Sequence, residues 1–182
     1  MMAELAKVTR QKEELFDQLW QKHKDDLVIG KISAKDFLRM IILEHKLELD
    51  LEEVFARWQQ LYVVKEELIN WELLQLLSTL KRQGVQLHLL SNAVRFDEDS
   101  SWKEKVFADF THIFRSYEIG LKKPDPLIYQ FALQKTNSLP NQALFIDDDL
   151  SNVVASRNEG IRSHHFQNVA TLKEELGDLL LD

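Results

Sequence analysis

The chain has 182 residues and a formal net charge of −7, and 45% of its residues are hydrophobic, which suffices to bury the core of one globular domain. The negative charge argues against binding to nucleic acid or an anionic membrane, because both carry charge of the same sign. Cysteine is absent, which excludes disulfides, thiolate nucleophiles and cysteine zinc sites. No apolar run is long enough for a membrane span or a signal peptide, so we expect a cytoplasmic protein.

Three amphipathic helices are predicted in the first third of the chain, where apolar residues recur at helical spacing and no strand pattern is found. Ser33 and Asp36 have the spacing of a capping box at the start of the second helix. Asp50 is the expected N-cap of the third helix. Residues 1–64 are therefore predicted to form a small helical subdomain with aromatic side chains in its core. The helices are expected over Met1–Lys24, Ser33–Leu43 and Leu51–Tyr62.

Helical and strand-like segments alternate over residues 65–182, a pattern typical of a parallel sheet covered by helices on both faces. We therefore predict an α/β fold class with a doubly wound parallel sheet, and a ligand crevice at the carboxyl ends of the strands. The expected helices are Glu66–Gln83, Trp102–Phe110, Ile128–Leu133, Asn152–Gly160 and Thr171–Leu181, and the expected strands are Val85–Leu90, Ile113–Ile119, Ala143–Asp147 and Arg162–Phe166.

Three adjacent carboxylates, Asp147, Asp148 and Asp149, stand where the third strand meets its helix. They repel one another, and a hard cation such as Mg²⁺ relieves this repulsion best. The alternative is that Asp149 or Ser151 caps the helix while the other acids are solvated.

Two other strand ends carry polar side chains, Ser91-Asn92 after one strand and Lys123 after another. A hydroxyl and an amide can donate hydrogen bonds to an oxyanion, and a lysine neutralises phosphate charge. Taken singly, Ser91-Asn92 is more commonly a polar turn and Lys123 a solvated side chain. If they meet the acids in one crevice, the site combines hydrogen-bond donors, a cation and metal-holding carboxylates. These are the groups that phosphoryl transfer requires.

These three strand ends resemble motifs of the haloacid-dehalogenase-like hydrolase superfamily. The segment His88–Asn92 is similar to its second motif. The segment Phe110–Tyr129, with Lys123 directly before proline, is similar to the third motif. The segment Phe145–Asp148, with Asn152 downstream, is similar to the fourth. The preceding helical segment resembles the small helical cap of one branch, and the nearest branch is that of the sugar-phosphate phosphatases.

The resemblance implies a Mg²⁺-dependent phosphatase that acts on a small phosphorylated metabolite. Ser91 would hydrogen-bond the transferring phosphoryl group and Asn92 would support it, while Lys123 would neutralise its charge. Ser91 and Lys123 would thus be catalytic as well as substrate-binding. Asp147 and Asp148 would hold Mg²⁺, and the sequence leaves open which of the two is the direct ligand.

One departure from the family is decisive for catalysis. The first motif, a strand ending in Asp-x-Asp that supplies the nucleophile and the general acid-base, is absent, and the chain begins in the helical segment. Although Asp147–Asp149 also fits Asp-x-Asp, its downstream residues match the fourth motif. We therefore expect an N-terminally shortened hydrolase that is inactive as given. The alternative is a catalytically dead phosphate-binding or protein-interaction module.

The absent strand also has a structural consequence. In the family it lies in the middle of the sheet, between the strand that ends at Ser91 and the strand that ends at Asp147. Its loss would leave two apolar strand edges open, and open edges can pair with another chain. Oligomerisation through these edges is therefore a further expectation.

Overall fold

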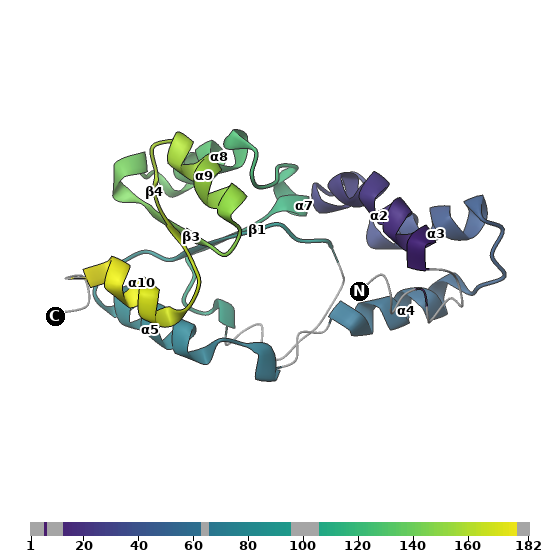
Figure 1. Ribbon diagram of the computed structural model, residues 1–182, viewed down its shortest axis with the longest axis horizontal. Coiled ribbons are helices and arrows are strands. Elements are labelled where there is room, and N and C mark those ends of the chain that lie inside the picture. The colour runs from purple at the N-terminus through teal and green to yellow at the C-terminus, as the bar shows by residue number, and fades with distance from the viewer. Residues whose placement is uncertain (1–5, 7–12, 63–65, 96–105, 178–182) are drawn as a thin grey trace. The chain divides into compact units, whose positions relative to one another are not determined.

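The computed structural model describes residues 6, 13–62, 66–95 and 106–177 and divides into two compact units (Figure 1). The first, here called the helical unit, comprises Met1–Leu68, Asn92–Ser101 and Ser116–Gly120; the second, called the α/β unit, comprises Ile69–Ser91, Trp102–Arg115 and Leu121–Asp182. Parts of three predicted helices lie outside the described residues, namely the beginning of the first, the beginning of Trp102–Phe110 and the end of the last.

The helical unit contains helices α2 (Glu13–Val28), α3 (Ala34–Glu44) and α4 (Leu51–Tyr62). Both predicted N-caps are confirmed, since Ser33 Oγ accepts from the backbone N–H of Asp36 at 3.0 Å and Asp50 Oδ1 accepts from that of Glu53 at 2.8 Å. The core between these helices is apolar and aromatic, and its fully buried members include Phe16, Phe37 and Trp58. The short elements η1 (Glu66–Leu68) and α7 (Ser116–Ile119) also belong to this unit.

The α/β unit alternates helices with short parallel strands, which confirms the predicted fold class. In chain order its elements are α5 (Trp71–Arg82), β1 (His88–Ser91), β2 (His112–Arg115), α8 (Pro126–Thr136), η2 (Pro140–Gln142), β3 (Leu144–Asp147), α9 (Leu150–Asn158), β4 (Arg162–His165) and α10 (Val169–Leu176). None of the helices in the described part of the chain is both long enough and apolar enough to cross a membrane.

Two predicted elements differ most from the structure. The helix expected over Glu66–Gln83 begins only after Asn70, whose side chain accepts from the backbone N–H of Leu73 at 2.9 Å and thereby starts α5. The strand expected over Ile113–Ile119 ends at Arg115, and residues 116–119 form a helical turn instead. There the buried hydroxyl of Ser116 donates to Val28 O at 2.6 Å, so a distant contact turns the chain.

Helices cover both faces of the β3–β4 sheet, as the doubly wound arrangement requires. Leu144 and Ile146 pack against the buried cluster formed by α5 and α10. Phe145 points the other way, because successive side chains of a strand alternate between faces, and its ring meets Tyr129 of α8 edge-on at 5.3 Å. Figure 1 shows α5 beside α10 and, away from them, α8 beside α9.

The four strands form two separate two-stranded parallel sheets, not one continuous sheet. Strand β1 pairs with β2, with His88 opposite His112, and β3 pairs with β4, with Leu144 opposite Arg162. Among the described strands, no pairing joins β1 to β3. No described strand pairs with the other backbone edge of β1 or of β3, so these edges could accept a further strand.

The imidazoles of His88 and His112 meet at the start of the β1–β2 sheet, with their Nδ1 atoms 3.2 Å apart. Burial and the nearby charge of His112 lower the pKa of His88 below its ordinary value. The unfolded chain therefore takes up a proton at a higher pH than the folded chain does. His88 therefore costs no stability above about pH 6.5, where it is neutral in both states, and its protonation in the unfolded chain lowers stability as the pH decreases below that value.

We expect the loss of stability on acidification to be smaller in His88→Gln than in the wild-type chain, because glutamine does not titrate. Urea unfolding at pH 7.5 and pH 5.5 measures the loss for the wild-type chain and the variant. Equal losses in the two proteins would show that another group causes the pH dependence.

Candidate active site

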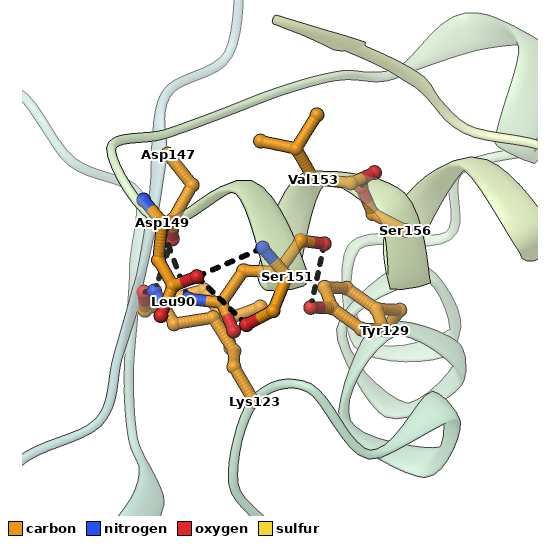
Figure 2. A network of polar contacts seen from close by, with 9 residues as sticks. Leu90, Lys123, Tyr129, Asp147, Asp149, Ser151, Val153 and Ser156 are labelled. Carbon is orange, nitrogen blue, oxygen red and sulfur yellow. Dashed lines mark hydrogen bonds and ion pairs between the residues drawn. The ribbon is translucent and has the colours of Figure 1, made fainter. Parts of the chain in front are cut away.

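A buried ion pair between Lys123 and Asp147 forms the centre of the candidate site. Lys123 precedes α8, and its Nζ donates to Asp147 Oδ2 at 2.6 Å at the end of β3. The same nitrogen donates to Leu90 O at 2.9 Å, one residue before Ser91 in β1 (Figure 2). The side chains of Lys123 and Asp147 are only 11% and 5% exposed. The structure thus brings both predicted residues to the carboxyl ends of two strands.

The Asp147 carboxylate has one acceptor position that no donor among the described residues occupies. Its Oδ1 accepts from the backbone N–H of Asp149 and from Asn152 Nδ2, both at 2.9 Å. With Lys123, the described residues supply three donors to a carboxylate that offers about four lone-pair positions. The remaining position, on Oδ2, suits one direct bond to a hard cation such as Mg²⁺. The donor set therefore fits the predicted metal.

Asp148 contributes a more accessible carboxylate beside Asp147. Its side chain is exposed, and its carbonyl oxygen lies 3.0 Å from His165 Nε2. Within the described ranges, no group of three or more histidine, cysteine, aspartate and glutamate side chains could hold a metal ion. Mg²⁺ needs fewer protein ligands than that, since it retains water and takes up phosphate oxygens beside one or two carboxylates.

Asp149 has a different task, because it is the N-cap of α9. Its Oδ1 accepts from the hydroxyl of Ser151 at 2.7 Å and from the backbone N–H of Ser151 at 2.8 Å. These two hydrogen bonds lower the pKa of Asp149, with the hydroxyl as the larger cause. The capping alternative is therefore confirmed for Asp149, whereas Asp147 turns inward to Lys123.

The two other predicted residues follow one another at the end of β1. Ser91 is the last residue of the strand and is half-buried. Asn92 is exposed and is the first residue of the connector that belongs to the helical unit. The bond from Lys123 to Leu90 O fixes the strand next to Ser91, while the roles of Ser91 and Asn92 stay predictions.

Tyr129 is a residue of this network to which the sequence assigned no role. It is 1% exposed, and its hydroxyl donates to Asn152 O at 2.9 Å (Figure 2). Burial, followed by the charges of Asp147 and Asp149, raises the pKa of Tyr129 far above its ordinary value. The sequence could have indicated this contact, because Tyr129 lies in the apolar helix after Lys123 and a buried tyrosine hydroxyl usually has a hydrogen-bond partner.

The arrangement is that of an α/β unit with charged residues at the carboxyl ends of its parallel strands. The family model for haloacid dehalogenase-like hydrolases matches residues 2–160. The chain therefore belongs to the haloacid dehalogenase-like hydrolase family.

Two relatives illustrate the range of proteins in which this family occurs. The chain is 27% identical over 162 residues to D-ribitol-5-phosphate phosphatase of Bacteroides thetaiotaomicron, an alignment that covers 85% of this chain and 76% of that protein. It is 29% identical over 116 residues to bifunctional epoxide hydrolase 2 of Rattus norvegicus, which covers 59% of this chain and only 20% of the much longer relative.

Solved structures show the same fold. A haloacid dehalogenase-like family enzyme from Bacteroides thetaiotaomicron superimposes with a TM-score of 0.76 at 22% identity, over 97% of this chain and 89% of the enzyme. The same enzyme is also known in complex with magnesium and inorganic phosphate, and that structure gives a TM-score of 0.71 at 22% identity over 94% and 88% of the two chains.

Proposed function

We propose that the α/β unit is the core of a Mg²⁺-dependent phosphatase that acts on small phosphomonoesters, with sugar phosphates as the substrate class. The observation that carries this proposal is the buried Lys123–Asp147 pair, in which the carboxylate keeps one acceptor position. Support comes from the similarity to D-ribitol-5-phosphate phosphatase and from the magnesium and phosphate bound by the structural relative.

Each side chain has one role in this proposal. Ser91 and Asn92 donate hydrogen bonds to the phosphoryl oxygens, and Lys123 offsets their charge. Asp147 and Asp148 hold the metal, which when bound polarises the phosphoryl group. Residues 1–64 would be the cap subdomain, whose side chains would select the substrate, and residues 65–182 would be the catalytic core.

We further propose that turnover needs one more strand. Apart from β3, whose Asp147–Asp149 segment is assigned to the fourth motif, the sequence offers no strand that ends in Asp-x-Asp, and β1 and β3 are not paired with one another. A strand between them would hydrogen-bond to both edges and deliver a nucleophile and a general acid-base beside Lys123 and Asp147. Without that strand, the chain binds Mg²⁺ and phosphate but does not hydrolyse the ester.

The open edges of β1 and β3 also favour a second candidate function. Edges of this kind pair readily with strands of other chains, so the protein would be a catalytically dead phosphate-binding or protein-interaction module. A second copy of the chain could fill the same place, which would make the protein an oligomer. If either of these alternatives is correct, a fused strand that ends in Asp-x-Asp would not give the chain phosphatase activity.

Magnesium binding tests the core of the proposal. We expect Mg²⁺ with inorganic phosphate to bind the purified chain, and Asp147→Asn to weaken binding at least about tenfold, because it removes a ligand charge. Isothermal titration calorimetry measures both affinities. Asp109→Asn is the matched control, since Asp109 contacts Ser78 and Lys81 instead. No binding by the wild-type chain, or equal binding by Asp147→Asn, would overturn the proposed function.

A further inference from the structure

We infer that Tyr129 is the positioning residue of the metal site, an inference that rests on the proposed function. Its hydroxyl donates to Asn152 O at 2.9 Å, and Asn152 Nδ2 donates to Asp147 Oδ1 at 2.9 Å. Tyr129 is thus one hydrogen-bonded residue away from the proposed ligand. It is 1% exposed and acts through Asn152, so it is not a catalytic residue.

The ring of Tyr129 holds the strand that carries Asp147. It meets the Phe145 ring edge-on at 5.3 Å with an interplanar angle of 82°. Phe145 and Asp147 are two residues apart and lie on the same face of β3. Lys123 Nζ lies 5.6 Å from the centre of the same Phe145 ring. The tyrosine therefore fixes the strand beneath the ion pair.

The hydroxyl of Tyr129 holds the helix that supplies the two Oδ1 donors. Asn152 and Asp149 belong to the first turn and the N-cap of α9. In an α-helix the carbonyl of Asn152 already accepts a backbone hydrogen bond from the residue four positions later. The hydroxyl is therefore not needed to satisfy that carbonyl, and its contribution is to fix the position of the first turn. Figure 2 shows Tyr129 reaching α9 from the side opposite Asp147.

This geometry assigns Tyr129 a measurable effect on the metal. In Tyr129→Phe the ring stays in place, while the first turn of α9 loses its anchor and Asn152 holds Asp147 less firmly. Removal of outer partners of metal ligands typically weakens binding about 10- to 100-fold. Because Tyr129 acts through one intervening residue, we expect a loss of about 5- to 10-fold in Mg²⁺ affinity.

The matched control is Ser156→Ala, which removes a fully buried hydroxyl that belongs to α9 itself. Ser156 Oγ bonds to Val153 O at 2.9 Å and to Ser163 Oγ at 2.6 Å. None of its bonds leads to Asp147, so we expect its Mg²⁺ affinity to stay within about twofold of the wild-type value. Both variants should remain folded, as circular dichroism would verify.

The experiment compares Mg²⁺ affinities in the presence of phosphate and adds a metal-free measurement, the ¹³C chemical shift of the Asp147 carboxyl. We expect Tyr129→Phe to weaken Mg²⁺ binding and move that resonance, and Ser156→Ala to do neither. In an Asn152→Ala background, Tyr129→Phe should have a smaller effect than it has alone, since the path through Asn152 Nδ2 is gone and only the Asp149 N–H remains to be positioned.

Equal effects of Tyr129→Phe and Ser156→Ala, or full additivity with Asn152→Ala, would overturn the inference. A wild-type chain that bound no Mg²⁺ while Tyr129→Phe still moved the Asp147 resonance would overturn the proposed function, yet support the positioning of Asp147 by Tyr129.

Discussion

Fusion of an apolar strand ending in Asp-x-Asp upstream of Met1 should raise Mg²⁺-dependent hydrolysis of an aryl phosphate by at least about 10²-fold over the chain alone. Positioned general acid-base catalysis contributes about 10²- to 10⁴-fold by itself, and the first carboxylate adds a nucleophile. The unfused 182-residue chain should stay near the background rate. Release of the aryl alcohol, followed by absorbance, measures both rates.

The place for such a strand follows from the two separate sheets. Leu90 of β1 and Phe145 of β3 are only half-buried, although strands inside a doubly wound sheet are normally buried on both faces. An inserted strand would supply the backbone hydrogen bonds that the two edges lack and would cover these side chains. Its carboxyl end would meet Lys123, which contacts both β1 and β3.

Two controls separate catalysis from stabilisation by the fused strand. A fusion whose two acids are replaced by asparagine keeps the strand but should be inactive. A fusion carrying Asp147→Ala keeps the nucleophile and should lose most of its activity through loss of the metal. An unfused chain with clear activity, abolished by Lys123→Ala and Asp147→Ala, would contradict the prediction and require a nucleophile within the chain itself. A fusion that folds but has no phosphatase activity would favour the alternative that the chain is a catalytically dead binding module.

Lys123→Ala should lower the free energy of unfolding by about 3–5 kcal/mol, the typical cost of leaving a buried charge without its partner. The pair spans 2.6 Å, and both side chains are almost fully covered. In the described part of the chain, Lys123 is the only cation that forms an ion pair with Asp147, and the substitution would remove it. Urea unfolding followed by circular dichroism measures the loss.

Lys81→Ala is the matched control for this stability change. Lys81 pairs with Asp109 at 3.2 Å, but the two side chains are 42% and 38% exposed. An ion pair that is open to water contributes little to stability, so the control should lose much less stability than Lys123→Ala. If Lys123→Ala lost no more stability than Lys81→Ala, the Lys123–Asp147 pair would not be the buried contact described above. Saturating Mg²⁺ should restore part of the loss, because the cation would offset the charge of Asp147.

Local signals were sufficient for much of the fold. The caps at Ser33 and Asp50 depend on side chains and backbone groups three residues apart, so the sequence alone could place them. The alternation of helices and strands predicted the α/β class for the same reason. Lys123 and Asp147 were predicted together because the carboxyl ends of parallel strands share one edge of a sheet, although their roles in binding stay predictions.

The sequence by itself determined the family, the fold class and the order of charged residues at the strand ends, because motif spacing and periodicity are local properties of the chain. Only the tertiary structure decided which groups meet. The turn at Ser116 depends on Val28, and the bond from Lys123 to Leu90 joins residues 33 positions apart. The link from Tyr129 through Asn152 to Asp147, and the separation of the strands into two sheets, likewise arise from packing between distant segments, which no local pattern encodes.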